Sequence, residues 1–349
     1  MQRRLSSRRA RNSIDIDRFK ESNMGMHVTR RTVLATLTAT IAGAPHRVFA
    51  QAKWPTRAVT LQVGYPSGGA TDFGARIFSD GARAFTSVPF VVENRAGAAG
   101  TLAAGATLRS NPDGYTLFVG TSNETTMLKS IRRAPPYALS DFAPLAMILD
   151  YPMVLIVPAS SPVSTWQDFL KAGKEKGDRM NYASPGVGSA VQFFTERVVN
   201  LSGLQASPIY YRGSTAAAPD ILAGRVDFAL DVLPTWTSSI RSGAVRAIAV
   251  STRERLPQAP NIPSLRELGL PIEERVGWNG LFAPSKTPVD IQNEIIELAR
   301  SVLQGPARPK IEAAGYRPGT LFGADFRAFI QQDEVAWEKL VKSTNFQPE

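Results

Sequence analysis

Short runs of alternating apolar residues are followed, along most of the chain, by segments with helical periodicity. The first run predicts a strand near residues 59–65, which Pro66–Gly69 ends, and a helix from about Thr71. The apolar stripe of that helix comprises Phe73, Ile77, Gly81 and Ala84. Further strands are expected at Val88–Val92, Tyr115–Gly120 and Met153–Val157. This alternation is typical of α/β layers with largely parallel strands.

The same arrangement recurs in the middle of the chain. A strand at Asn181–Ser184 precedes a Gly-rich loop, Pro185–Gly188, and then a helix marked by Phe193, Phe194, Val198 and Leu201. The two strand–loop–helix units lie about 115 residues apart, as expected if each begins its own lobe. Because ligands bind beyond the carboxyl ends of strands in open α/β sheets, two facing lobes would form a cleft.

Two more helices are expected near the C-terminus. Thr287 predicts an N-cap, with Pro288 at the first helical position and Asp290 three residues after the cap. The apolar positions of this helix are Ile291, Ile295, Leu298 and Val302. A last helix is expected from about Asp325, with apolar residues Phe326, Phe329, Trp337, Leu340 and Val341.

The positive charge is concentrated at the N-terminus. The 349 residues include 40 Lys and Arg against 30 Asp and Glu, and residues 1–50 hold ten of the basic and three of the acidic residues. Both histidines, His27 and His46, lie in this segment, and the chain has no Cys. If the segment is removed, the basic excess indicates no nucleic-acid partner. The mature chain then has no His- or Cys-dependent nucleophile, no zinc site of these ligands and no disulfide, and we expect no pH switch near neutrality.

The N-terminal segment has the pattern of a signal peptide. Arg30–Arg31 precede an uncharged run, Thr32–Pro45, and small residues lead to Ala50. The apolar run of about 12 residues is too short to span a bilayer, and the arginine pair fits either general or twin-arginine export. A buried N-terminal helix is a weaker interpretation because a run of small Thr and Ala residues packs poorly. No Cys follows, so we expect a soluble periplasmic protein without a lipid anchor.

The two Gly-rich loops are the main candidates for ligand binding, because N–H groups at a helix N-terminus bind anions. The phosphate-loop motif is absent, and Gly186-x-Gly188 lacks the third glycine of the dinucleotide fingerprint. Ser189 lies outside a Gly-x-Ser-x-Gly elbow and has no histidine to activate it. A carboxylate held by backbone N–H groups therefore fits best. The alternative is that the glycines only permit tight turns, although two matched loops favour binding.

Two acidic residues could also carry function. Asp72 lies in the first turn of a helix, where it either complements the helix dipole or contacts a ligand. Asp231 ends the apolar strand Val226–Leu230 and could accept hydrogen bonds from a ligand or from a neighbouring loop. A hydrolase or lyase with either acid as base and Tyr65 or Tyr211 as partner is disfavoured, because no candidate acid and base groups are adjacent. We therefore expect no catalytic residue, metal or cofactor.

The order of the motifs resembles that of the extracytoplasmic solute receptors of tripartite tricarboxylate transporters, the Bug receptors. The resemblance extends from Trp54–Pro55 to about Thr344. Its motifs are Tyr65–Asp72, Val91–Gly97, Pro112–Leu117, Asp141–Pro144, Asn181–Ser189, Tyr211–Gly213, Gly224–Asp227, Arg246–Val250 and Trp278–Pro284. Each motif is weak alone, but their order and spacing together are specific.

The resemblance implies a two-lobed α/β periplasmic binding protein of type II-like architecture, each lobe a mixed, mostly parallel sheet flanked by helices. Residues 51–151 and 276–349 would form lobe 1, residues 152–275 lobe 2, and residues 1–50 the signal peptide. The protein would be a monomer that closes on a small organic acid in the interlobe cleft and delivers it to the permease subunits of a tripartite tricarboxylate transporter. A ligand sensor for a two-component system remains the alternative, since it would use the same residues.

The resemblance also implies a carboxylate held by both loops and a distal pocket that selects the ligand. The first loop would contribute Tyr65, Ser67, Gly68, Gly69, Ala70 and Asp72; the second Ser184, Gly186, Gly188 and Ser189; and the distal pocket Thr121, Asn123, Tyr211, Gly213 and Asp231. Three positions depart from the family pattern: Ser67 and Ala96 replace prolines, and Gln192 stands where histidine is frequent. Ser67 adds a hydroxyl and loosens the first loop.

Residues 1–23 are strongly charged, whereas Met24 or Met26 would begin a leader of ordinary length. We expect translation to begin at one of these methionines. A chain lacking residues 1–23 should therefore reach the periplasm as efficiently as the full chain, measured by cell fractionation. Loss of export from the shorter chain would contradict this start site.

Overall fold

The computed structural model describes residues 53–256, 259–272, 276–344 and 346–348. Lys53–Glu349 forms one compact unit. The expected signal peptide, residues 1–50, lies outside the described residues together with both proposed start sites. None of the helices in the described ranges has the length and apolar character that a membrane crossing requires.

The first sheet is built around three parallel strands. β1 (Val59–Val63) pairs with β2 (Phe90–Asn94) on one side and with β3 (Thr116–Gly120) on the other. β9 (Val276–Pro284) runs antiparallel to β3, and the first part of β4 (Phe142–Pro158) runs antiparallel to β9. Each strand expected in this region is present, with bounds shifted by one or two residues.

The second sheet has the same mixed character. β5 (Asn181–Ser184) runs parallel to β6 (Ser207–Tyr210) and to β7 (Phe228–Val232). The later part of β4 pairs antiparallel with β7 and with β8 (Val245–Val250). The first strands of the two strand–loop–helix units, β1 and β5, therefore pair in parallel with their neighbours. Every described pair that includes β4 or β9 is antiparallel.

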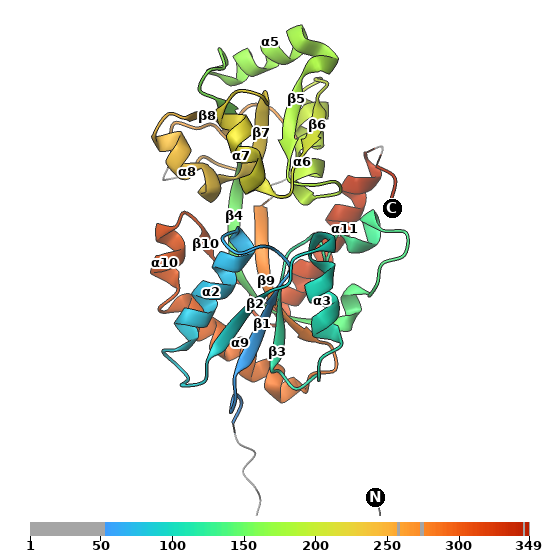
Figure 1. Ribbon diagram of the computed structural model, residues 1–349, viewed down its shortest axis with the longest axis vertical. Coiled ribbons are helices and arrows are strands. Elements are labelled where there is room, and N and C mark those ends of the chain that lie inside the picture. The colour runs from blue at the N-terminus through green and yellow to red at the C-terminus, as the bar shows by residue number, and fades with distance from the viewer. Residues whose placement is uncertain (1–52, 257–258, 273–275, 345, 349) are drawn as a thin grey trace, which may run out of the picture. The chain divides into compact units, whose positions relative to one another are not determined.

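β4 belongs to both sheets, and Figure 1 shows it continuing from one into the other. It pairs with β9 and β10 (Arg317–Pro318) up to Pro152, and with β7 and β8 from Met153. The sequence predicted only its last part, Met153–Val157. Fifteen of its seventeen residues are buried, so the run lacks the alternation of a half-exposed strand. Pro144 and Pro152 also interrupt it, and proline normally indicates the end of a strand.

Helices pack against both sheets (Figure 1). They are α2 (Ala70–Ala82), α3 (Thr101–Leu108), α4 (Leu128–Ile131), α5 (Trp166–Lys176), α6 (Ala190–Leu201), α7 (Ser214–Leu222), α8 (Leu233–Arg241), α9 (Val289–Gln304), α10 (Arg308–Ala313) and α11 (Ala324–Lys342). Short 3₁₀ turns lie at Ala98–Gly100, Leu139–Asp141 and Gly177–Arg179. The four helices that the sequence predicted correspond to α2, α6, α9 and α11.

The buried face of α2 agrees with the expected stripe only at Gly81. Phe73 and Ile77 lie at the edge of the core, and Ala84 is exposed beyond the end of the helix. The buried side instead includes Gly74 and Phe78. Glycine and alanine on this side let the helix approach the sheet closely. Phe73 and Ile77 therefore did not identify the buried face, although both are large and apolar. Phe73 stacks on the ring of Tyr316, with centroids 4.8 Å apart.

The expected cap of α9 is also shifted. The helix begins at Val289, with Pro288 in the N-cap position and no side-chain cap. Thr287 is buried, and its hydroxyl has no hydrogen-bond partner among the described residues. Its N–H group donates to the carbonyl of Pro284 at 3.0 Å, so Thr287 belongs to a turn that precedes the helix. Asp290 does lie in the first turn, as predicted.

One apolar cluster joins the elements of the two sheets. Met127 and Ile131, which follow β3, pack with Phe193 of α6 and with Trp337 and Leu340 of α11. α11 therefore contacts helices that belong to different sheets. This contact lies beside the loop that follows β3, which carries two of the predicted site residues.

Asp333 of α11 fixes the same loop from its other side. This carboxylate is buried, and its Oδ2 accepts hydrogen bonds from Thr126 Oγ1 at 2.6 Å, Trp337 Nε1 at 3.1 Å and Trp278 Nε1 at 3.3 Å. A buried carboxylate is stable only when its oxygens are hydrogen-bonded, so the loop, β9 and α11 are held in one arrangement.

Gly277 of β9 pairs with Tyr151 of β4, close to the point where β4 changes partners. A Cβ atom at Gly277 would lie 1.9 Å from Cε2 of the buried Tyr151 ring. We expect Gly277→Ala to lower the free energy of unfolding by about 1–3 kcal/mol, because the ring must move within a packed core. Urea denaturation measures this change.

Gly105→Ala in α3 is the matched control. The added methyl group there meets only the flexible end of Arg109, at 3.1 Å, and alanine favours a helix by about 1 kcal/mol over glycine. The control should therefore be unchanged or more stable. A Gly277→Ala variant as stable as the parent chain would contradict the close contact.

Candidate functional site

The first Gly-rich loop joins β1 to α2 and is held by the carboxylate of Asp72. Its Oδ2 accepts hydrogen bonds from the N–H of Gly68 and from Nε of Arg76, each at 2.9 Å. Its Oδ1 accepts from Nδ2 of Asn94 at 2.9 Å. Asn94 also donates to the carbonyl oxygen of Tyr65 at 3.0 Å. These bonds fix the backbone of the loop at both ends.

Asp72 is therefore a structural residue of the loop. Burial raises the pKa of its carboxyl group, but the hydrogen bonds from its three donors outweigh burial and lower the pKa below its usual value. Asp72 also complements the dipole of α2, one of the two roles weighed from the sequence. The N–H groups of Gly69 and Ala70 donate no hydrogen bond to any described residue. These two donors at the start of α2 are available to an anion.

The second Gly-rich loop joins β5 to α6. Most of its hydrogen bonds join residues of the loop to one another or to the first turn of α6. Ser189 caps α6, and its Oγ accepts from the N–H of Gln192 at 3.2 Å. The N–H of Gly188 donates to Oε1 of Gln192 at 2.8 Å. Oγ of Ser184 donates to the carbonyl of Gly186 at 3.2 Å. These hydrogen bonds hold the backbone of the loop in one conformation. The N–H group of Gly188 is already used as a donor to the Gln192 amide oxygen.

The sequence predicted no site role for Gln192, which stands where histidine is frequent in the family. It is buried, and its Nε2 donates to Glu196 Oε1 at 2.8 Å and to the hydroxyl of Tyr210 at 3.1 Å. The side chain thus links the second loop to α6 and to the end of β6. A glutamine can donate and accept at once without changing charge, which suits this position.

Three of the predicted glycines border open space. Gly68, Gly186 and Gly213 have positive φ angles of 88°, 152° and 99°, and a Cβ atom at any of them would meet no atom within 4 Å. Backbone conformation therefore requires glycine there, and packing does not. Gly188, with φ of 70°, differs because a Cβ atom would lie 3.6 Å from the ring of Phe346. The C-terminal segment covers the second loop at this point.

A polar cluster brings together predicted residues from distant parts of the sequence. The hydroxyl of Tyr65 donates to Oε2 of Glu124 at 2.8 Å, and Nδ2 of Asn123 donates to the Tyr65 hydroxyl at 3.2 Å. Thr121 donates to Glu124 through both its N–H group, at 2.6 Å, and its Oγ1, at 2.8 Å. Glu124 lies at the centre of the cluster, and only its place next to Asn123 in the sequence could have indicated it.

The same cluster reaches the second sheet. Oδ1 of Asn123 accepts a hydrogen bond from the N–H of Ala190, the first residue of α6, at 2.9 Å. Asn123 follows β3, whereas α6 follows β5, so this bond joins loops of the two sheets. The bond also uses one of the backbone N–H groups at the N-terminus of α6.

Glu124 is completely buried and forms no ion pair with a described residue. Burial raises the pKa of its carboxyl group to about 7, although the hydrogen bonds from Thr121 and Tyr65 oppose this shift. Glu124 therefore titrates near neutrality although residues 51–349 contain no histidine, and the expectation of no pH switch there stays a prediction. The cause is desolvation, which depends on the fold.

Asp231 bonds to neighbouring segments, one of the two possibilities weighed from the sequence. Its Oδ1 accepts from Oγ of Ser214 at 2.7 Å, and its Oδ2 accepts from Nε1 of Trp236 at 2.8 Å. Burial raises the pKa of Asp231, and these hydrogen bonds lower it in part. Asp231 thus fixes the starts of α7 and α8 at the end of β7.

Tyr211 and Gly213 lie beside the second loop. The N–H of Tyr211 donates to the carbonyl of Ser184 at 2.9 Å, and the N–H of Gly213 donates to that of Pro185 at 3.1 Å. The Tyr211 hydroxyl donates to Oδ2 of Asp220 at 2.8 Å. The backbone of this segment therefore extends the wall of the second loop.

The arrangement gives no acid–base pair from the four residues considered for catalysis. The hydroxyls of Tyr65 and Tyr211 donate to Glu124 and Asp220, and the oxygens of Asp72 and Asp231 are bonded to other donors. In the described ranges, no group of three or more His, Cys, Asp or Glu residues could hold a metal ion.

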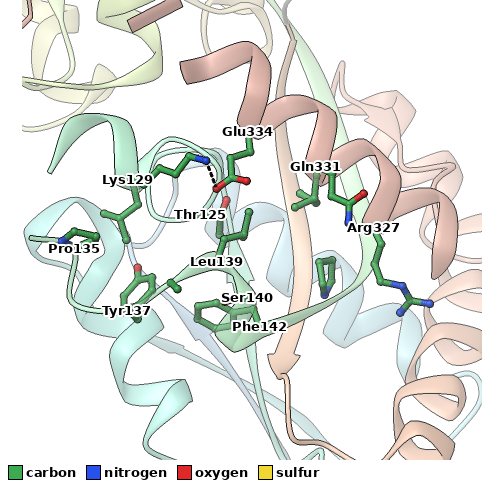
Figure 2. A pocket seen from close by; sticks show the side chains of 14 residues that line it. Thr125, Lys129, Pro135, Tyr137, Leu139, Ser140, Phe142, Arg327, Gln331 and Glu334 are labelled. Atoms are coloured by element: carbon green, nitrogen blue, oxygen red, sulfur yellow. Dashed lines mark ion pairs between the residues drawn. The ribbon is translucent and has the colours of Figure 1, made fainter. Parts of the chain in front are cut away.

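A cavity of about 740 Å³ lies elsewhere, between α11 and residues 125–144 (Figure 2). Tyr137, Leu139 and Phe142 line it from one side, and Arg327 and Gln331 line it from α11. None of the fifteen predicted ligand-binding residues lines this cavity. It is therefore separate from the candidate site.

Comparison with known proteins places the chain among transport receptors. Protein BugT of Bordetella pertussis is 30% identical over 322 residues, which cover 91% of this chain and 98% of that protein. The structure of R. palustris Rpa4515 with adipate is 29% identical, with a TM-score of 0.79, and covers 85% of this chain and 100% of that one. MatC (Rpa3494) from Rhodopseudomonas palustris with bound malate is 27% identical, with a TM-score of 0.74, and covers 82% of this chain and 100% of that one.

These similarities confirm the expected fold class, the two-lobed α/β fold of periplasmic binding proteins. The family described as "Tripartite tricarboxylate transporter family receptor" matches residues 75–346. Members of this family bind solutes for transport and are not enzymes. This chain therefore belongs to the receptor family of the tripartite tricarboxylate transporters.

Proposed function

We propose that this chain captures a small organic carboxylate in the periplasm and delivers it to the membrane permease subunits of a tripartite tricarboxylate transporter. Membership of the receptor family supports the transport role. The bound adipate and malate of the two similar structures support the class of ligand. The receptor acts as a monomer after export removes residues 1–50, and it has no nucleic-acid partner.

The free N–H groups of Gly69 and Ala70 carry this proposal. They lie at the positive end of the α2 dipole, beside the open space at Gly68. A charge-assisted hydrogen bond contributes about 1.5–3 kcal/mol, so a few of them supply much of the roughly 8 kcal/mol of a micromolar ligand. Because Asp72 holds the loop before the ligand arrives, little entropy is lost on binding.

The second loop would complete the site from the opposite lobe. We assign residues 51–151 and 276–349 to lobe 1 and residues 152–275 to lobe 2. The change of β4 partners between Pro152 and Met153 supports a hinge there. Ser184, Gly186, Gly188 and Ser189 then face the first loop when the lobes close.

The distal part of the pocket selects the ligand. We assign to it Thr121 and Asn123 from lobe 1, and Tyr211, Gly213 and Asp231 from lobe 2. The open space beside Gly213 supports this assignment. The side chains of Tyr211 and Asp231 are hydrogen-bonded to other segments of the protein. These two residues therefore contribute to ligand selection through the shape and charge of the pocket wall.

Thermal denaturation of residues 51–349 with a panel of carboxylates tests the class of ligand. The panel contains di- and tricarboxylates, acidic amino acids and aromatic acids, each paired with its uncharged amide. A ligand at about 100 times its dissociation constant stabilises by roughly 2.7 kcal/mol, which raises Tm by about 2–4 °C in a chain of this size. We expect a shift with one acid and none with its amide. Equal shifts with acid and amide would contradict an anion receptor.

Gly69→Asp tests the first loop without straining it. Gly69 is the N-cap of α2 with φ of −84°, and a Cβ atom there would meet only the carbonyl oxygen of Pro66, at 3.8 Å. Aspartate at an N-cap stabilises a helix, but its charge repels a bound carboxylate. We expect at least a 100-fold loss of affinity for the acid identified in the panel, with an unchanged or higher Tm.

Gly69→Asn is the matched control because asparagine caps the helix equally well and is neutral. Titration calorimetry should show a much smaller loss for this variant than for Gly69→Asp. Equal affinities of the two variants would remove the first loop from the anion site.

A further inference from the structure

We propose that Glu124 is a positioning residue of the receptor, which acts through Tyr65 to orient the amide of Asn123 and so holds the contact between the lobes at the start of α6. The inference rests on the proposed function, because it gives Tyr65 and Asn123 a role in closure. The side-chain hydrogen bonds of Glu124 go to Tyr65 and Thr121 rather than to α6, and Glu124 does not border the open space at the loop glycines. Its effect is transmitted by three hydrogen bonds.

These three bonds form a chain with a single direction. The N–H of Ala190 donates to Oδ1 of Asn123 at 2.9 Å, Nδ2 of Asn123 donates to the Tyr65 hydroxyl at 3.2 Å, and that hydroxyl donates to Oε2 of Glu124 at 2.8 Å. Above its pKa of about 7, Glu124 is a carboxylate that only accepts hydrogen bonds, so the Tyr65 hydroxyl donates to it. The hydroxyl oxygen of Tyr65 is then free to accept, so the NH₂ group of Asn123 faces Tyr65 and its carbonyl faces α6.

Glu124 is held firmly enough to set this direction. Its Oε1 accepts from the N–H of Thr121, a backbone donor that cannot rotate, and its Oε2 accepts from Oγ1 of Thr121. A Cβ atom at Gly100, whose φ is 90°, would lie 3.0 Å from the carboxyl carbon of Glu124. The hydroxyl of Tyr137 donates to the backbone carbonyl of Glu124 at 2.8 Å. The carboxylate therefore has one position and one set of donors.

Glutamine at position 124 would reverse the chain. Its single oxygen must stay opposite the Thr121 N–H, which places the NH₂ group where Oε2 accepts from Tyr65. The Tyr65 hydroxyl then accepts from the glutamine, and its proton turns to Asn123, which lies at 3.2 Å, rather than to Oγ1 of Thr121 at 3.4 Å. The Asn123 amide turns over, and its NH₂ group opposes the N–H of Ala190. Replacement of the buried Oε2 of Glu124 by an NH₂ group thus changes the contact between Asn123 and Ala190 from attraction to repulsion.

The bond to Ala190 lies beside the apolar contact of Met127 and Ile131 with Phe193. Apolar packing favours closure but does not fix the orientation of the lobes, since it has no direction. A directed hydrogen bond at its edge supplies that orientation. The N–H of Ala190 belongs to the helix whose N-terminal loop is assigned to the anion, so its position affects the ligand.

Amide hydrogen exchange at Ala190, measured by NMR in the ligand-free protein at a pH above the pKa of Glu124, tests the proposal. We expect Asn123→Ala to speed exchange at Ala190 about tenfold, the effect of one lost hydrogen bond, and Glu124→Gln to do the same from a distance. The double variant should also exchange about tenfold faster rather than a hundredfold, because both changes break one chain. Glu93→Gln is the matched control, since Glu93 bonds to Gln62 and Arg95 away from the chain. It should leave Ala190 unchanged.

A purely structural role for Glu124 predicts a different result. Exchange would then rise throughout β3 as much as at Ala190, and the two substitutions would multiply in the double variant. Either observation, or an unchanged Ala190 amide in Glu124→Gln, would overturn the proposal. If Glu124→Gln does not fold, Tyr65→Phe keeps the ring, removes the middle link and should give the same tenfold change. The measurement needs no ligand, so it can fail while carboxylate binding stands, and the reverse also holds.

Discussion

The backbone hydrogen bonding of β4 is the constraint on which both sheets depend. The strand pairs with β9 and β10 along its first part and with β7 and β8 along its last six residues. Nearly all of its side chains are buried, so it belongs to both cores at once. A break in β4 would expose unpaired backbone groups in each sheet. The loops of the candidate site are therefore carried on two sheets that share one continuous strand.

Buried carboxylates set the positions of the loops. Asp72 holds the first Gly-rich loop, Asp231 the starts of α7 and α8, Asp333 the loop after β3, and Glu124 the cluster beside it. Each of these acids accepts hydrogen bonds from donors of other segments, as a buried charge requires. The oxygens of these carboxylates are therefore bonded to donors of the protein itself. The proposed anion site uses instead the backbone N–H groups at the start of α2, which carry no net charge and need no arginine.

The pKa of Glu124 shows why composition is an incomplete guide to pH dependence. Residues 51–349 contain no histidine, the side chain that normally titrates near pH 7, but desolvation raises the pKa of this glutamate into that range. Its folded-state pKa is higher than that of an exposed glutamate, so its contribution to stability is present at acidic pH and is lost as the pH rises through about 7. Such a group can be recognised only from its surroundings.

The sequence by itself determined the fold class, the two strand–loop–helix units and the family, because these depend on local periodicity and on motifs in order along the chain. It also identified the residues of the three loops, several of which the fold brings together, as it does Tyr65, Thr121 and Asn123. Only the tertiary structure decided the course of β4, the buried face of α2, the central place of Glu124 and the partners of Asp72 and Asp231. Those features arise from burial and from hydrogen bonds between residues far apart in the sequence, such as the paired Asp150 and Arg317, and a local pattern contains neither.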